Sequence, residues 1–144
     1  MLVHRIVPFI AAAVVACTVG LPAGAVAQVP ESRVVIQVSD ADPGKWNLAL
    51  NNAKNLQVDL GGAKHVDIEI VAYGPGIGML KADSVVGNRI GEALGSGVKI
   101  VACENTMRGQ KLDKADMLNG IGYVAAGVVE IVRRQQEHWA YLRP

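Results

Sequence analysis

The residue of this chain that is best suited to chemistry is Cys103. It closes the apolar run 98–103 and is followed at once by the polar stretch 104–106, with Arg108 close behind. A thiol at a helix N-terminus or beside cationic side chains has a lowered pKa, and the thiolate is the form that acts as a nucleophile or carries sulfur. Free cysteine is equally one of the most buried residue types. The position therefore fits either a reactive thiol or an inert, packed one.

The N-terminal residues predict export from the cytoplasm. His4 and Arg5 form a short cationic start, the stretch 6–19 is apolar, and Ala-Val-Ala at 25–27 matches a small-residue cleavage site. The apolar run is too short for a comfortable transmembrane helix, and polar sequence follows it. We therefore expect a cleaved signal peptide over residues 1–27 and a periplasmic or secreted protein.

A second cysteine, Cys17, offers an alternative to soluble export. The stretch 14–17 resembles a bacterial lipoprotein box, which would leave Cys17 lipidated at a new N-terminus. We adopt soluble export, because the Ala-x-Ala site follows a leader of more usual length. In both cases the domain lies outside the cytoplasm, and Cys103 is left without a cysteine for an internal disulfide.

The remainder of the chain has the size of one domain, which we place at residues 28–144. Removing residues 1–27 from the 144 leaves 117 residues, and Arg5 is the only Lys or Arg lost, so 13 basic and 13 acidic residues remain. A net charge of zero gives no electrostatic footprint for nucleic acid or for an anionic membrane. A domain this small buries a useful core but gains from oligomerisation.

Apolar runs of strand length alternate along the chain with helical patterns. We predict strands at 33–38, 66–73, 98–103, 121–125 and 139–142, helices at 43–60, 85–94 and 128–138, and short helical turns within 104–120. Asp42 followed by Pro43 fits the N-cap and the first position of the first helix. This alternation indicates an α/β fold with a parallel sheet covered on both faces.

In such sheets, ligands bind beyond the carboxyl ends of the strands. The loops at that end carry Asp40, Asp42, Lys45, Tyr73, Cys103, Glu104, Asn105, Arg108 and Lys111. His65 precedes a strand and His138 ends a helix antiparallel to the strands, so both fall at the opposite end. A Cys-His dyad within one subunit is therefore not expected, and activation of the thiol must come from the helix N-terminus and from cationic neighbours.

The remaining motifs give little support to a phosphate or metal site. The glycine loop 74–78 lacks the spacing of a nucleotide-binding loop and is best explained as a tight turn that needs positive φ. One cysteine without a Cys-x-x-Cys pair or a nearby histidine pair lacks the usual spacing of metal ligands. We therefore expect no cofactor and no metal.

Three segments of the chain are distinctive: VKIVACENTMR at 98–108, GVVEIV at 127–132 and QQEHWAYLRP at 135–144. Together, and in this order, they resemble the exported branch of the DsrE/DsrF-like family. The resemblance implies a three-layer α/β/α sandwich with a five-stranded parallel sheet and assembly into trimers or hexamers. Some cytoplasmic members carry a persulfide on the cysteine after the third strand, the place of Cys103. Those members have an alanine-rich turn where this chain has 104–106.

Two functions from different classes follow. The leading hypothesis is a sulfur-handling homo-oligomer in which Cys103 carries sulfane sulfur between donor and acceptor proteins, with Asn105 and Arg108 steadying the anion. The runner-up is a non-catalytic binding module that holds a small ligand or a partner protein. Its pocket would be formed by Asp40, Lys45, Tyr73 and Gly76, with Cys103 only lining it.

Overall fold

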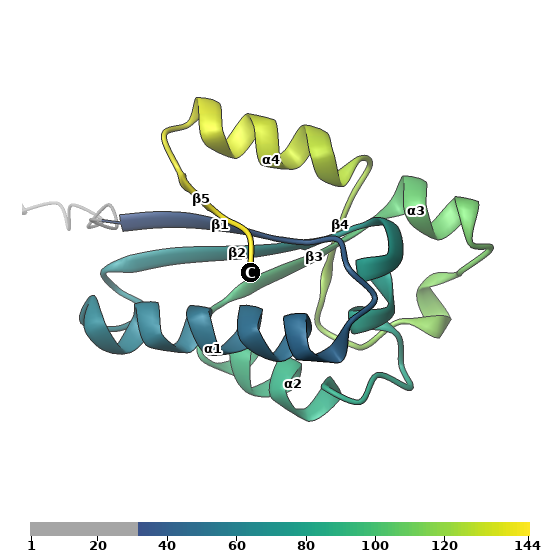
Figure 1. The fold of residues 1–144 in the computed structure, drawn as a ribbon, viewed down its shortest axis with the longest axis horizontal. Helices are drawn as coiled ribbons and strands as arrows, with labels where there is room; N and C mark the ends of the chain where they lie inside the picture. The colour runs from purple at the N-terminus through teal and green to yellow at the C-terminus, as the bar shows by residue number, and fades with distance from the viewer. Residues whose placement is uncertain (1–31) are drawn as a thin grey trace, which may run out of the picture.

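The strands form where the sequence has short runs of β-branched and other apolar residues. The computed structural model describes residues 32–144. In it, one sheet has the order β4-β3-β2-β1-β5 and every pairing is parallel (Figure 1). Its members are β1 (Ser32–Val38), β2 (Val66–Ala72), β3 (Lys99–Cys103), β4 (Gly122–Val124) and β5 (Ala140–Leu142). The five-stranded parallel α/β fold predicted from the sequence is therefore confirmed.

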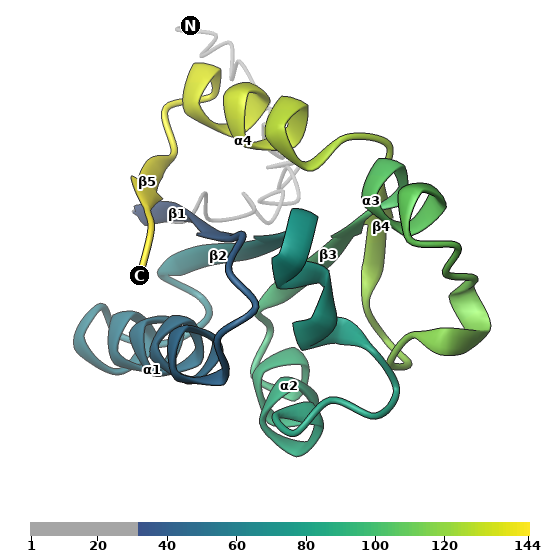
Figure 2. The ribbon, with the colours of Figure 1, turned by 45° about the vertical axis from the view of Figure 1, so that its right-hand side comes forward.

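Helical segments connect the strands and cover both faces of the sheet. They are α1 (Pro43–Asp59), η1 (Gly74–Leu80), α2 (Gly87–Gly95), α3 (Glu104–Gly109), η2 (Lys114–Asp116) and α4 (Gly127–Gln136). From β1 to β4 the chain steps steadily towards one edge, and right-handed crossovers then place α1 and α2 on the same face. The connection from β4 to β5 runs back across the sheet, so α4 lies on the opposite face (Figures 1 and 2).

The first helix begins where the sequence predicts it. The Asp42 side chain accepts a hydrogen bond from the Gly44 N–H at 2.7 Å, and Pro43 occupies the first helical position. The inward stripe of α1 is buried at Trp46, Ala49, Leu50 and Ala53. The Trp46 indole N–H donates to the Asp40 carbonyl at 2.7 Å, which ties the start of the helix to the end of β1.

The two faces of the sheet carry cores of very different size. The face under α1 and α2 has a cluster of 22 buried residues, including Ile36, Ile70 and Ile100. The face under α4 has only four, namely Val35, Val71, Ile131 and Trp139. Since buried apolar area provides most of the stabilisation, α1 and α2 are held mainly by packing, whereas α4 rests on a thin apolar contact.

Two local predictions from the sequence need correction. Residues 74–80 form a 3₁₀ helix rather than a simple loop, because Ile77, Met79 and Leu80 are drawn into the core. Gly74 does have positive φ, at 53°, as a tight turn requires. The helix predicted at 85–94 begins only at Gly87, and Val85 lies outside it and is exposed.

Among residues 32–144, no helix is both long and apolar enough to cross a membrane. The expected signal peptide over residues 1–27 and the alternative lipidation site at Cys17 lie outside the described residues.

Candidate functional site

Cys103 is the last residue of β3 and the N-cap of α3. Its backbone is extended, with φ −78° and ψ 111°, so the chain turns directly from the strand into the helix. The side chain is buried, with 5% of its surface exposed. A buried thiol in such a place is either core filling or a group whose surroundings stabilise a particular ionisation state.

The surroundings of the sulfur are hydrogen-bond donors. The Thr106 hydroxyl and the backbone N–H groups of Gly127, Thr106 and Asn105 lie near it and lower its pKa. The Thr106 oxygen itself accepts from the Gly74 N–H at 2.9 Å, which leaves the hydroxyl proton for the sulfur. The donor set therefore comes from the starts of two helices, α3 and α4.

These donors determine the ionisation of Cys103. Burial by itself raises the pKa of the thiol, because it removes the thiolate from water. The hydrogen bonds from Thr106, Gly127 and Asn105 favour the charged form and outweigh burial, so the pKa of Cys103 lies below that of an ordinary thiol. The site therefore favours a sulfur anion without any basic side chain.

The order of the strands explains why these groups meet. β3 lies between β2 and β4, so the turns that follow all three strands share one end of the sheet. The Asn105 N–H also donates to the Ala125 carbonyl at 3.1 Å, which joins the start of α3 to the end of β4. A Cβ on Gly127 would lie 3.0 Å from the Tyr73 Cβ, so glycine allows α4 to begin close against β2.

Asn105 and Arg108 lie beside Cys103, but their side chains bind each other. The Arg108 guanidinium donates to the Asn105 side-chain oxygen, and both residues are exposed. Asn105 reaches the sulfur through its backbone N–H only. The Glu104 carboxylate lies 3.9 Å from the Lys114 ammonium.

Asp40, Lys45, Tyr73 and Gly76 are spread over the turns after β1 and β2. The Asp40 carboxylate pairs with Arg143 at 3.5 Å, across the β1–β5 boundary where the strand order reverses. Lys45 lies in the exposed first turn of α1. Because β2 stands between β1 and β3, Asp40 and Lys45 lie about 10 Å away from Cys103 at the usual spacing of strands, whereas Tyr73 and Gly76 follow β2, the direct neighbour of β3.

Gly76 has a packing role in the structure. A Cβ at this position would lie 2.3 Å from the Val38 carbonyl oxygen, a distance that no side chain tolerates. The residue is buried and lets η1 pass directly against the end of β1. Tyr73 caps the start of η1 and packs against Gly127, next to the Cys103 site.

With this geometry established, comparison with known proteins places the chain. Residues 33–144 match the model of the DsrE/DsrF-like family. The chain belongs to this family. It is similar to MTH1491 of Methanobacterium thermoautotrophicum, a protein of unknown function, with 42% sequence identity, a TM-score of 0.74, and coverage of 78% of this chain and 99% of that one.

Two more distant structures share the DsrE/DsrF-like fold. BT1422 of Bacteroides thetaiotaomicron, also of unknown function, is 20% identical with a TM-score of 0.62, and the match covers 78% of this chain and 95% of that one. The ychN protein of E. coli is 14% identical with a TM-score of 0.63, with coverage of 78% and 99%. No curated protein matches the chain.

Sequence reasoning missed Thr106 and Gly127, which do most to define the site of this DsrE/DsrF-like protein. Thr106 is the third residue after the N-cap, the spacing at which capping interactions reach back to the cap residue, and this signal was available. Gly127 comes from a different connection, and only the placement of β4 beside β3 brings it near. His65 and His138 lie at the opposite end of the sheet, as predicted.

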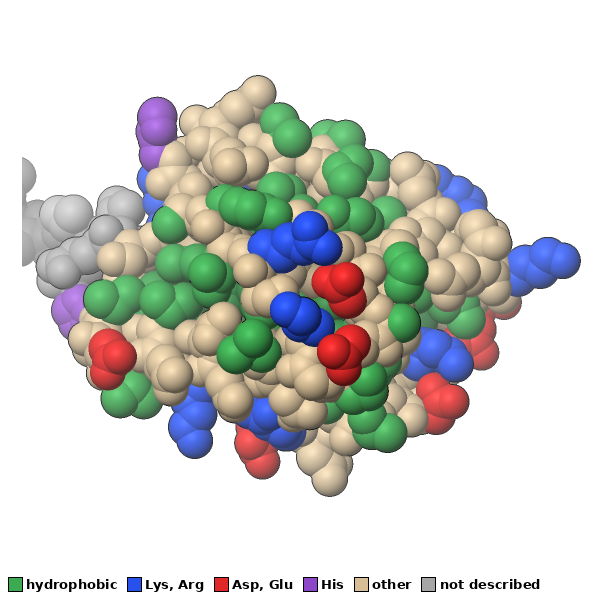
Figure 3. Space-filling view, in the orientation of Figure 1, with side chains coloured by type: hydrophobic (Ala, Val, Ile, Leu, Met, Phe, Trp, Pro, Cys, Tyr) green, Lys and Arg blue, Asp and Glu red, His purple; other side chains and the backbone are tan. Residues whose placement is uncertain are grey.

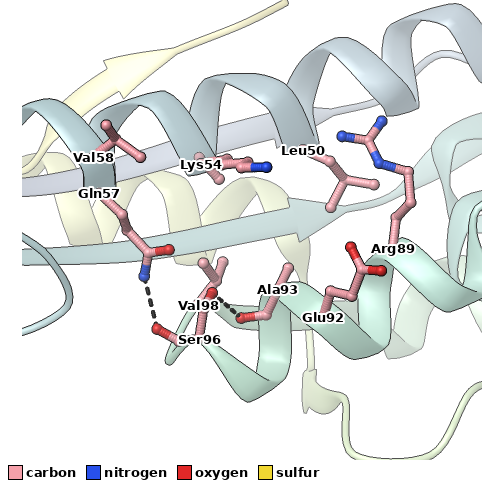
Figure 4. Close-up of a pocket in the computed structure, with 10 residues that line it drawn as sticks. Leu50, Lys54, Gln57, Val58, Arg89, Glu92, Ala93, Ser96 and Val98 are labelled. Carbon is pink, nitrogen blue, oxygen red and sulfur yellow. Dashed lines mark hydrogen bonds between the residues drawn. The ribbon is translucent and has the colours of Figure 1, made fainter.

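Within residues 32–144, no group of three or more His, Cys, Asp or Glu side chains is placed to hold a metal ion. A cavity of about 300 Å³ lies between α1 and α2, with Leu50, Ala53 and Val98 among its lining residues (Figure 4). Gln57 donates to the Ser96 carbonyl at one end of it, and Arg89 bonds to Asn51 of α1 at 2.6 Å. With these polar groups bonded between the helices, we assign the cavity no chemistry.

Proposed function

We propose that this DsrE/DsrF-like protein handles sulfur, with Cys103 accepting and donating sulfane sulfur as a persulfide. The observation that carries the proposal is the place of Cys103 between β3 and the starts of α3 and α4, where donors of Thr106, Gly127 and Asn105 lie near the sulfur and lower its pKa. Donors that are fixed in a site of low polarity stabilise a sulfur anion strongly, because they need no reorganisation when charge develops. They would serve a thiolate and a persulfide anion equally well.

The transfer step is redox-neutral. The Cys103 thiolate attacks the outer sulfur of a donor persulfide or polysulfide. A new S–S bond forms at Cys103, the donor S–S bond breaks, and the donor leaves as a thiolate or as a polysulfide shorter by one sulfur. Delivery reverses the step, since an acceptor thiolate attacks the outer sulfur and Cys103 leaves as the thiolate.

The burial of Cys103 restricts the donor to a slender sulfur chain. Only 5% of Cys103 is exposed, so a bulky electrophile does not reach its sulfur. The end of a polysulfide or of a protein persulfide is an unbranched chain of sulfur atoms, which is narrow enough to do so. Donor and acceptor proteins are therefore expected to present their sulfur on an extended arm. Arg108, exposed and close in the chain, adds positive charge for an approaching polysulfide anion.

We further propose that the protein works as a homo-oligomer outside the cytoplasm. Members of this family often form oligomers. The outer surface of α4 carries exposed apolar residues at Val128, Val129 and Val132, 53%, 62% and 52% exposed, and Figure 3 shows hydrophobic side chains over this helix. Exposed β-branched residues on one helix face favour a protein interface. Export rests on the leader-like sequence of residues 1–27.

Mass spectrometry of the intact protein tests the sulfur proposal. Protein incubated with polysulfide, or with thiosulfate and a sulfurtransferase, should gain the mass of sulfur and lose it again with a reducing thiol. Cys103→Ser should gain none. If wild type and Cys103→Ser give the same spectrum, the proposal fails.

A further inference from the structure

A buried carboxyl group stands in the middle of the sheet under α4. Glu69 lies at the centre of β2 and is 1% exposed. Its Oε2 is 2.5 Å from the Arg134 guanidinium, and its carboxyl group is hydrogen-bonded to that of Glu130. Both partners lie on the inner side of α4, so one side chain of the sheet binds two successive turns of the helix.

Charged side chains come close to Glu69 from α4 and from the strand β3. From α4 and the residue after it come Glu130, Arg133, Arg134 and Glu137. The strand β3 contributes Lys99, and β2 contributes Asp67, two residues before Glu69. On β1, the residue paired with Glu69 is the apolar Val35. Arg134 Nε lies 2.9 Å from Glu130 Oε1, as an ion pair whose angle is too poor for a hydrogen bond. Glu69 Oε1 accepts no hydrogen bond from any donor among residues 32–144.

Among residues 32–144, few other contacts hold α4 against the sheet. The apolar core beneath it has four residues, and the N-cap residue Ala126 has no side chain to bond the first turn. Gly127 packs against Tyr73, but a glycine contributes no anchor of its own. The bonds from Glu69 to Arg134 and Glu130 are therefore the main specific contacts between this helix and the sheet.

We propose that Glu69 is a positioning residue for Cys103: by anchoring α4 through Arg134 and Glu130, it holds the Gly127 N–H against the sulfur. Gly127 begins the same helix, and seven residues of helix separate it from Arg134, about 10 Å of rigid backbone. A shift of the anchored turns therefore moves the first N–H of α4 relative to Cys103. The inference deepens the proposed function, because it concerns the thiolate that the sulfur chemistry uses.

The ionisation of the pair agrees with an anchor made from one shared proton. Burial raises the pKa of Glu69, and the hydrogen bond that its protonated form donates to Glu130 adds to that rise. Glu130 is itself partly desolvated, but its bonds to Arg133 and Glu69 lower its pKa overall. Of the two carboxyl groups, Glu69 is therefore the one that takes up a proton first as pH falls, and the neutral acid can then donate to Glu130 while it accepts from Arg134.

The test measures the pH dependence of Cys103 alkylation by iodoacetamide in the folded protein. Glu69→Val removes the anchor, and Asp67→Val is its matched control on the same strand and face. Without the Gly127 N–H, the midpoint of the rate profile should move upward in Glu69→Val, with alkylation at neutral pH slowed by roughly three- to tenfold. Asp67→Val should keep the wild-type midpoint.

Two further variants complete the test. Glu69→Gln keeps one donor and one acceptor and should restore the wild-type midpoint. Arg134→Lys keeps the charge but loses the forked contact, so it should move the midpoint upward by less than Glu69→Val does. If Glu69→Val does not fold, Arg134→Lys decides the matter.

The inference is wrong if folded Glu69→Val or Arg134→Lys has the wild-type midpoint. It is also wrong if the midpoint of Asp67→Val shifts as far as that of Glu69→Val, or if the midpoint of Glu69→Gln is as high as that of Glu69→Val. Alkylation needs no sulfur donor. The alkylation test can therefore be read even if Cys103 takes up no persulfide, and the loading test can be read even if the midpoint does not move.

Discussion

At the scale of single residues, the pKa of Cys103 is lowered by nearby hydrogen-bond donors and not by a basic side chain. Its sulfur faces the Thr106 hydroxyl and backbone N–H groups from the starts of two helices. A histidine partner would take up and return a proton, as nucleophilic hydrolases require, whereas fixed donors only hold a negative charge. The arrangement therefore suits a carrier of anionic sulfur better than a hydrolytic nucleophile.

Thr106 is the side chain whose removal should change the Cys103 thiol most directly. In Thr106→Val the sulfur loses a side-chain hydrogen bond, and a bond to a charged group is worth about 1.5–3 kcal/mol. The pKa of Cys103 should therefore rise, and alkylation at neutral pH should slow by roughly tenfold or more, since about 1.4 kcal/mol corresponds to a factor of ten. Alkylation rates across pH would reveal this rise. Thr106→Ser keeps the hydroxyl and should stay near wild type, and an unchanged Thr106→Val profile would contradict the role.

Sequence alone could place Cys103 but not its donors. An apolar run that ends in cysteine before polar residues puts the thiol at the carboxyl end of a strand, and the structure confirms that position. The choice of Asn105 and Arg108 as side-chain ligands followed their polarity and charge. In the structure these two side chains bind each other, because both project outward from α3. Which face of a short helix points inward depends on packing.

At the scale of elements, the parallel sheet was predictable because its strands are continuous apolar runs. β1, β2 and β3 lie within two residues of the predicted ranges. The segment 74–80 was not predicted as a helix, because its glycines and proline are typical of turns. Its 3₁₀ conformation depends on the burial of Ile77, Met79 and Leu80, which is a tertiary effect.

Gly76 provides the sharpest test of this packing. Gly76→Ala forces a methyl group into the 2.3 Å gap to the Val38 oxygen, so η1 must move away from β1. We expect a loss of about 3 kcal/mol or more in the free energy of unfolding, measured by urea denaturation. Gly91→Ala is the control in α2, where a Cβ meets nothing within 4 Å, and it should stabilise by about 0.5–1 kcal/mol. Equal stability of Gly76→Ala and wild type would contradict the packing.

At the scale of the whole molecule, the exposed valines of α4 are the surface that best fits a second copy of the chain. Val129→Glu places a charge in this apolar surface and should weaken association by at least about tenfold, since burying a valine contributes about 1.5 kcal/mol or more. Sedimentation velocity over a range of concentrations measures the change. Val58→Glu alters an exposed valine of α1 and should leave the assembly intact. A wild-type protein that stays monomeric at all concentrations would rule out the interface.

The buried carboxyl group also gives the molecule a pH-dependent stability. Burial raises the pKa of Glu69, so the folded state holds this proton more tightly than the unfolded state does. The Glu69 contribution is therefore fully present below the ordinary pKa of glutamate and is lost as pH rises through the raised value. Glutamine has no carboxyl proton to lose. In Glu69→Gln the free energy of unfolding should therefore rise relative to that of wild type as pH increases through the raised pKa of Glu69. Denaturation at a series of pH values would show parallel curves if the carboxyl group had no such role.

The central claim is that Cys103 is a reactive thiolate and not a packed wall of a binding pocket. The most direct measurement is labelling of the folded wild-type protein with a small thiol reagent as pH is varied, followed by intact mass. We expect labelling of Cys103 in the native state, with a midpoint below that of an ordinary thiol, because hydrogen bonds outweigh burial in setting its pKa. Labelling that occurs only after denaturation would contradict the account and favour the binding module.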